Sequence, residues 1–337
     1  MLGRDRFLNT RPEDVMSQIQ MDIANIPEGD LKRAGVEGSK VELTEEEIAK
    51  QVRKKKIIRR SVIAVVCVAL IAIGAIVSTK YYFIPKSHYD TAMVNIEKSD
   101  YAGAYYELND LDYSDSKEQF AKVIRHPETK AQLLADVKAG STVLFGTYKY
   151  MPYMDDVRPV EWEVLERDGN KALLISKYVL DCAKFHENDD LTFWGKSTLR
   201  GWLNNEFYDE VFSKAEKKAI DQVPNTPGVE DTGNLGNNDT KDRVFLLSAK
   251  ELAEYFNDST SRQCEGTDLA VTYLNGIRSY IRICNWWLRS TDQFGMNAMY
   301  VNAEGQCEAY GAAKTTEGIG IRPAIWIDLA KAAGNEK

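Results

Sequence analysis

Residues 61–79 read SVIAVVCVALIAIGAIVST, and none of these 19 side chains is charged. A helix of that length measures about 28 Å, close to the ~30 Å hydrocarbon core of a bilayer. A helix at the surface of a soluble protein normally keeps a polar face, and this stretch has none. The sequence therefore predicts a single transmembrane helix within residues 57–84, with the lipid bilayer as the partner of Ser61–Thr79.

Basic residues around this span predict its orientation. Seven Lys and Arg residues lie between residues 50 and 60, whereas three Lys residues lie in the twenty that follow the span. Because basic flanks stay in the cytoplasm, residues 1–56 are expected to form a cytoplasmic tail that is largely disordered and becomes helical from about residue 45. The C-terminal domain is then extracellular, and the chain is a single-pass protein of the cell membrane. Some 60 residues precede the span, which favours a retained anchor over a cleaved signal peptide.

The charge of the chain limits its partners. The net charge is −8, and residues 61–337 hold 30 basic and 40 acidic residues. Binding to nucleic acid requires a basic face that neutralises phosphates. Nucleic acid is therefore not expected as a partner.

Residues 87–137 have apolar side chains at helical spacing, interrupted by KSD and LDYSDS. This pattern predicts a helical hairpin followed by a further helix, with Pro127 in the first turn of that helix. The stretch resembles the tetratricopeptide-like hairpins that often follow a membrane anchor in bacterial surface proteins, and it covers one repeat unit at most. We interpret it as a short helical stalk, with a docking groove as the alternative.

Residues 140–330 mix strand and helix patterns, which predicts an α+β domain with antiparallel strands. VEWEVLERDGNKALLISKYVLD reads as two strands joined by a hairpin turn at RDGN. STLRGWLNNEFYDEVF reads as an amphipathic helix, with Trp202 on its apolar face as a structural residue.

Ordered segments in this domain resemble a known family. They are VLFGTY, VEWEVLERDGNKALLISKYVLDC, STLRGWLNNEFY, DRVFLLSAKEL, CEGTDLA, WWLRS and GIRPAIWI. Together they resemble domain-of-unknown-function family 6273, which occurs mainly in extracytoplasmic proteins of Gram-positive bacteria. The family usually has Pro-Gly after WWLRS, whereas this chain has Thr291-Asp292, so that turn is expected to differ.

The order of a Trp-rich strand, a hairpin and a Gly-x-Arg-Pro strand also looks like the end of the C-type-lectin-like fold. That resemblance implies a ligand-binding surface and a last strand that pairs with the first strand of the domain. The same fold occurs in formylglycine-generating enzymes, whose copper-binding cysteine pair has no counterpart of close spacing here.

The segment NWWLRST places two tryptophans side by side. Consecutive strand residues point to opposite faces, so Trp286 is expected in the core and Trp287 on a flank or in a pocket beside Arg289. Arg289 and Arg322 both need a carboxylate if they are buried. The candidate partners are Glu161, Glu163, Asp181 and Asp242. We interpret Trp286 and Arg322 as structural, and keep a ligand pocket lined by Trp287 and Arg289 as the alternative for those two.

Metal and thiol chemistry receive little support from the sequence. Only His186 of the three histidines lies in the C-terminal domain, and no H-E-x-x-H, G-x-S-x-G, C-x-x-C or P-loop motif occurs. No cofactor is expected, with Ca²⁺ in the loop of Asp231, Asp239 and Asp242 as the alternative to a plain solvated loop. Among the four cysteines after the span, Cys264 and Cys284 are the favoured disulfide pair, and free thiols are the alternative.

These patterns predict a membrane-anchored, extracytoplasmic binding module of a bacterial cell surface that is not an enzyme. Its expected ligand is a protein, a peptide or a glycan. The alternative is a cell-envelope enzyme whose active site follows no familiar motif.

Overall fold

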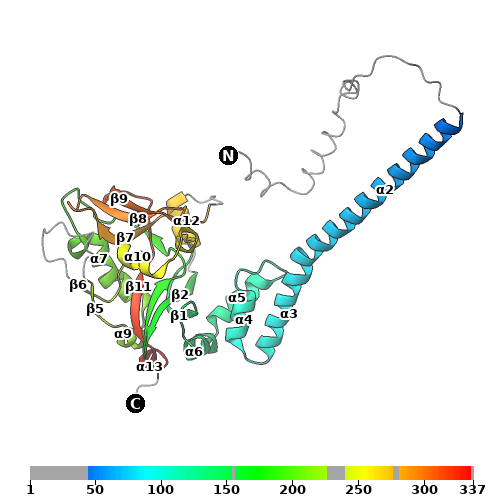
Figure 1. Ribbon diagram of the computed structural model, residues 1–337. Coiled ribbons are helices and arrows are strands. Elements are labelled where there is room, and N and C mark those ends of the chain that lie inside the picture. Colours follow the sequence, from blue (N-terminus) through cyan, green and yellow to red (C-terminus); the bar gives the residue numbers. More distant parts are fainter. Residues whose placement is uncertain (1–44, 154–155, 226–239, 276–280, 335–337) are drawn as a thin grey trace. The chain divides into compact units, whose positions relative to one another are not determined.

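The structure, a computed structural model, describes residues 45–153, 156–225, 240–275 and 281–334 (Figure 1). The chain divides into two compact units, Met1–Ala75 and Ile76–Lys337. Helix α2 (Glu45–Ser78) accounts for the described part of the first unit. The helix over Arg53–Glu97 is long and apolar enough to cross a membrane, and none of its most apolar stretch is buried within the protein. A single helix of membrane-spanning length is therefore confirmed in the described residues.

The second unit begins with the helical region that the sequence predicted. Its elements are η2 (Thr79–Phe83, one turn of π-helix), α3 (Ile84–Glu97), α4 (Tyr101–Leu108), α5 (Ser116–Arg125) and α6 (Pro127–Ala135). Helix α4 begins where the Asp100 side chain accepts a hydrogen bond from the Gly103 amide. Pro127 occupies the first turn of α6, where a missing N–H costs no helical hydrogen bond.

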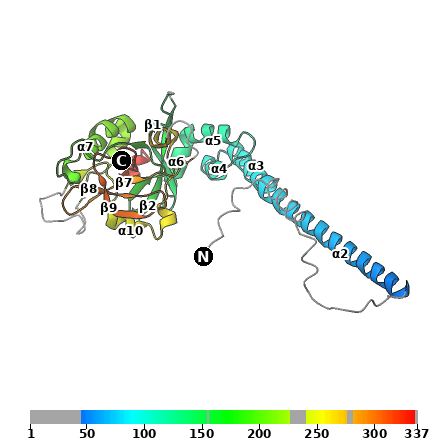
Figure 2. The ribbon, with the colours of Figure 1, turned by 90° about the horizontal axis from the view of Figure 1, so that it is seen from above.

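These helices share a core with the first strand of the domain. The cluster buries Ala92, Tyr105 and Leu133 together with Leu144, and Leu144 belongs to β1 (Thr142–Lys149). Figures 1 and 2 both show α6 lying beside β1. The predicted stalk therefore packs against the sheet through buried apolar side chains.

The first sheet has the strand order β1-β2-β3-β11, with every pair antiparallel. Its other strands are β2 (Val157–Asp168), β3 (Lys171–Ser176) and β11 (Ala324–Asp328). The predicted RDGN hairpin is confirmed as the β2–β3 turn, where Gly169 adopts the positive φ of 58° that a glycine tolerates best.

The prediction that the last strand pairs with the first strand of the domain was wrong. Strand β11 pairs with β3, and the first strand, β1, lies at the opposite edge of the sheet. The cause is the β2–β3 hairpin, whose two strands lie between the first and last strands.

The second sheet has the order β4-β10-β7-β8-β9, in which β10 and β7 are parallel and the other pairs antiparallel. These strands are β4 (Asp181–Cys182), β10 (Gly320–Ile321), β7 (Trp286–Thr291), β8 (Asn297–Val301) and β9 (Cys307–Ala313). A third, two-stranded sheet joins β5 (Val223–Asn225) to β6 (Thr240–Asp242). Mixed sheets and helices confirm the α+β class.

Short helices cover the sheets and connect the strands. They are η3 (Trp194–Lys196), α7 (Thr198–Trp202), η4 (Leu203–Phe207), α8 (Tyr208–Val211), α9 (Lys214–Ala219), α10 (Ala249–Tyr255), α11 (Ser259–Arg262), α12 (Asp268–Asn275) and α13 (Leu329–Ala332). The predicted amphipathic helix from residue 198 is confirmed as α7, η4 and α8, with Trp202 half-buried against Phe207.

Candidate functional site

Strand β7 buries both tryptophans of the WWLRS segment. Trp286 and Trp287 are each 0% exposed, because β7 is the central strand of its sheet and every residue along it is buried. Their indole N–H groups donate to the carbonyl oxygens of Arg262 and Ala183, at 3.1 and 2.9 Å. Trp287 therefore belongs to the core. The prediction that it lies on a flank or in a pocket was wrong.

Arg289 is also a core residue. Its guanidinium makes a two-pronged ion pair with Glu251, one contact being 2.7 Å between Nη2 and Oε1, and Nη1 donates to the Leu246 carbonyl at 2.7 Å. Glu251 in turn accepts from the Ser248 amide at the start of α10. The pair ties β7 to α10 and leaves Arg289 only 5% exposed, so we assign Arg289 to the structure rather than to a ligand pocket.

Arg322 has the structural position that was expected. Its guanidinium lies 5.1 Å from the Trp286 ring and 5.3 Å from the Phe256 ring. Nε donates to the Ser176 carbonyl at 3.0 Å, and Glu163 is the nearest carboxylate, at 3.5 Å. Arg322 thus links β10 and β11 to β3 and β2.

Asp231 and Asp239, two of the three residues named for the alternative Ca²⁺ site, lie outside the described residues. Asp242 is fully buried, and its carboxylate accepts from the side chains of Trp194, Arg200, Asn225 and Thr240. These donors occupy the oxygens that a metal would need. Within the described ranges, no group of three or more His, Cys, Asp or Glu side chains is arranged to hold a metal ion.

Cys264 and Cys284 are neighbours on adjacent segments, and both are buried free thiols. The Cys284 amide donates to the Cys264 carbonyl at 2.9 Å. Burial raises the pKa of the Cys284 thiol to about 11 and also raises that of Cys264. Few thiolates form at neutral pH, so neither thiol is an activated nucleophile in this state. Their oxidation to a disulfide stays a prediction.

A cleft of about 620 Å³ lies between the helices α4 and α5 and the body of the domain. That volume is within the range of small-molecule and peptide sites. The helical side contributes an apolar floor that includes Leu111, Phe120 and Ile124, and the sheet side contributes Pro159. The remaining lining is polar: Asn109, Asp110, Asp112, Lys117, Tyr150, Arg158, Glu161, Tyr178, Glu265, Asp268 and Arg282.

Ion pairs hold the sheet side of the cleft in place. Arg158 stacks on the Tyr150 ring, 3.8 Å from its centroid, and donates to Asp156 at 2.8 Å. Asp156 also accepts from Arg125 of α5 at 2.7 Å. The hydrogen bond from Arg158 lowers the pKa of Asp156, so this carboxylate stays ionised and keeps α5 attached to β2 at neutral pH.

A second set of contacts holds the opposite end. Arg282 donates to Asp268 at 2.8 Å and to the Gly266 carbonyl at 2.7 Å. The Leu269 amide donates to the Tyr150 carbonyl at 2.8 Å, which joins the start of α12 to the end of β1. The cleft walls are therefore fixed by contacts between distant parts of the chain.

Sequence patterns offered a docking groove in residues 87–137 only as an alternative to a stalk, and they did not indicate which residues line this cleft. Its side chains come from α4, α5, the loop after β1, β2, and the segments around residues 178, 265 and 282. The lining residues are scattered along the sequence, so no short motif contains them. Each charged residue, taken alone, is typical of a solvent-exposed surface.

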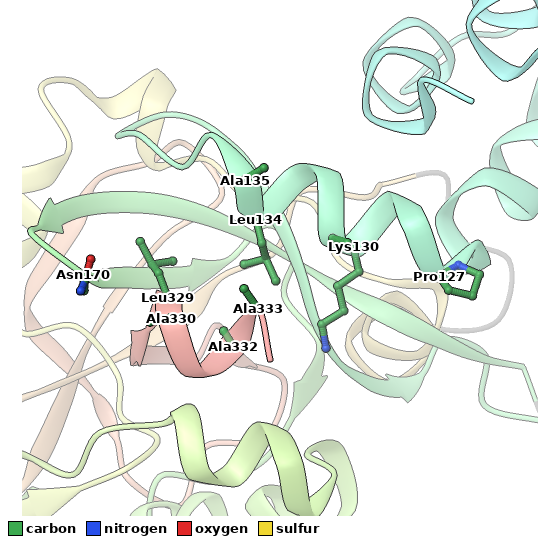
Figure 3. A pocket seen from close by; sticks show the side chains of 10 residues that line it. Pro127, Lys130, Leu134, Ala135, Asn170, Leu329, Ala330, Ala332 and Ala333 are labelled. Atoms are coloured by element: carbon green, nitrogen blue, oxygen red, sulfur yellow. The ribbon is translucent and has the colours of Figure 1, made fainter. Parts of the chain in front are cut away.

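A second cavity, of about 510 Å³, lies between α6 and α13 (Figure 3). It is lined mainly by alanine and leucine side chains, with Pro127 and Asn170 at its ends. Its cation, Lys130, is engaged by Glu216 at 2.5 Å. The first cleft offers far more polar chemistry, so we take it as the candidate site.

Comparison with known proteins identifies the C-terminal domain. Residues 169–329 match the family model described as a domain of unknown function, DUF6273, which confirms the resemblance expected for the C-terminal domain. Neither the curated proteins nor the solved structures contain a match to the chain. The C-type-lectin-like and tetratricopeptide-like resemblances stay predictions.

Arg289→Ala is expected to destabilise the domain. It removes a buried guanidinium and leaves the half-buried Glu251 without its cation, and breaking a buried ion pair costs up to about 3–5 kcal/mol. The thermal midpoint of the full-length protein in detergent should fall by about 6–15 °C, whereas the exposed Lys241→Ala control should leave it within about 2 °C. An unchanged midpoint for Arg289→Ala would refute the structural assignment.

Proposed function

We propose that this protein is a membrane-anchored, extracytoplasmic binding module of a bacterial cell surface and that the cleft between α4–α5 and the sheet holds its ligand. The observation that carries the proposal is the cleft itself: about 620 Å³ of space with an apolar floor, two tyrosines and fixed charges. Such a combination of apolar surface and a few oriented polar groups is typical of ligand sites.

The place of the cleft in the chain supports this proposal. It lies in the unit that follows the membrane-length helix, and about half of its lining comes from α4, α5 and the loop between them. A ligand in the cleft would contact these helices and the sheet at once. The helices then serve as one wall of the site as well as a spacer.

The proposed orientation puts the cleft outside the cell. Seven basic residues before the span, against three in the twenty after it, support a cytoplasmic N-terminus. Protease added to intact cells is expected to degrade the C-terminal domain and to leave an N-terminal epitope within residues 1–56 protected. Loss of the epitope with an intact domain would contradict this orientation.

The binding role is tested by filling the cleft. Ala121 of α5 lines it and is half-buried, so Ala121→Trp places an indole in the open space. The matched control is Ala333→Trp, which puts the same side chain into the cavity of Figure 3. Full-length protein in detergent is screened on glycan and peptide arrays, with and without Ca²⁺.

The expected outcome is a set of array ligands that bind the parent and Ala333→Trp proteins but lose at least about tenfold in affinity for Ala121→Trp. Binding should not require Ca²⁺, since the Asp242 carboxylate is already occupied by protein donors. An array without hits, or hits that Ala121→Trp leaves unchanged, would exclude the cleft as the binding site.

A further inference from the structure

Helix α2 carries a dense group of basic side chains directly before its apolar stretch. We call this group the basic collar, and its members are Lys50, Arg53, Lys54, Lys55, Lys56, Arg59 and Arg60. Residues 50–60 contain no acidic side chain. Figure 1 shows α2 as one continuous helix, so the collar and the uncharged residues 61–78 belong to the same rod.

The collar has little charge compensation from the part of the chain that the structure describes. Its side chains from residue 53 onward are all exposed. The one ion pair that the collar makes with the described residues joins Lys50 to Glu46, at 3.8 Å between two exposed side chains. An exposed pair of this kind contributes little, so the cations remain available to a partner outside the chain.

The cations surround the helix rather than forming one face. At about 100° per residue, Arg53, Lys54 and Lys55 project in three directions, about 100° apart. Lys56 and Arg59 occupy the remaining side, so no sector wider than about 100° lacks a cation. A protein partner would cover one side of the helix, whereas lipid headgroups reach it from every side. The arrangement therefore favours lipid over an acidic protein.

The collar lies at the depth expected for lipid headgroups. With a rise of about 1.5 Å per residue, Arg53 begins about 12 Å before Ser61, the first residue of the uncharged stretch. Headgroups extend about 5–8 Å beyond the hydrocarbon core, a distance that long basic side chains can span. Ile57 and Ile58 lie among the cations and are 64% and 54% exposed. The membrane interface accommodates such apolar and basic side chains together.

Phosphate is the group that these cations are suited to bind. A guanidinium can donate two parallel hydrogen bonds to a phosphate, and an ammonium binds it as a point charge. In phosphatidylcholine the choline cation offsets the phosphate, whereas an anionic phospholipid retains a net negative charge. Basic residues clustered beside a membrane helix therefore attract anionic lipids.

We propose that the basic collar binds anionic phospholipids in the leaflet beside residue 60 and surrounds α2 with their headgroups. The proposal rests on the membrane-length helix and is independent of the ligand of the cleft. The twenty residues after the span carry only Lys80, Lys86 and Lys98, and Lys86 is engaged by Asp90 at 2.5 Å. The bound lipids are therefore expected in one leaflet.

The test measures lipid association with the full-length protein reconstituted in phosphatidylcholine bilayers. Electron paramagnetic resonance of spin-labelled phosphatidylglycerol and spin-labelled phosphatidylcholine gives their relative association constant. The parent protein is expected to prefer phosphatidylglycerol by at least about threefold at low salt. The preference should largely disappear at about 1 M salt, where the screening length is about 3 Å.

Two triple variants separate the collar from overall charge. The first replaces three collar residues: Lys54→Gln, Lys55→Gln and Lys56→Gln. The second, the matched control, makes the same change after the span: Lys80→Gln, Lys86→Gln and Lys98→Gln. Glutamine is chosen because its helix propensity is close to that of lysine. The collar variant should lose at least about half of the preference, and the control should keep most of it.

Equal association of the two lipids with the parent protein would overturn the proposal. An equal loss of preference in both triple variants would also overturn it, because the lipids would then respond only to total charge. Binding of soluble oligo-glutamate to the collar in detergent, without a lipid preference in bilayers, would assign the collar to an acidic protein partner instead.

Discussion

The carboxylate of Glu161 joins the parts on which the candidate site depends. It lies on β2, accepts from Tyr105 of α4, and accepts from Lys177 just after β3. Lys177 also donates to Asn109 at the end of α4, at 2.7 Å. Helices and sheet are thereby held at one spacing, and the cleft is the space that this spacing leaves open.

Burial makes that arrangement costly to disturb. Glu161 would lose the Tyr105 hydroxyl if α4 moved away, and the apolar contact of Leu144 with the helical core would be lost in the same movement. The ion pairs of Asp156 with Arg125 and Arg158 also hold α5 against β2. The helices are therefore expected to open together with the sheet rather than separately.

Buried charges in the rest of the domain follow a common rule, in that each has partners from a different element. Arg289 has Glu251, and Asp242 has donors from four other residues. Lys314 is 1% exposed and donates to the carbonyl oxygens of Asp190 and Gly295, which fixes the segment before η3 to the β7–β8 turn. Burial lowers the pKa of Lys314. Single losses from such pairs leave an uncompensated charge in the core.

Local patterns predicted the features that local physics determines. The membrane-length helix follows from 19 uncharged residues, the β2–β3 hairpin from RDGN, and the start of α6 from Pro127. The α+β class follows from the same patterns, and the family resemblance identified the C-terminal domain.

Features that depend on long-range pairing were not predictable from one sequence. Glu163 was correctly among the candidate partners of Arg322, but Glu251 was not among those of Arg289, because no local pattern shows that α10 packs beside β7. The expected flank or pocket position of Trp287 was wrong because β7 is covered on both faces, so side chains on either face are buried. The cleft depends on strand order and on helix packing, which no short motif encodes.

Native-state hydrogen exchange of the full-length protein in detergent tests most directly whether helices and sheet form one cooperative unit. Amides of α4 and of β2 are expected to share the same highest opening free energy, and Glu161→Gln is expected to lower both together. If the amides of α4 exchanged through an opening several kcal/mol easier than that of β2, with β2 unaffected by Glu161→Gln, the helices would be an independent element and the cleft would not be a fixed site.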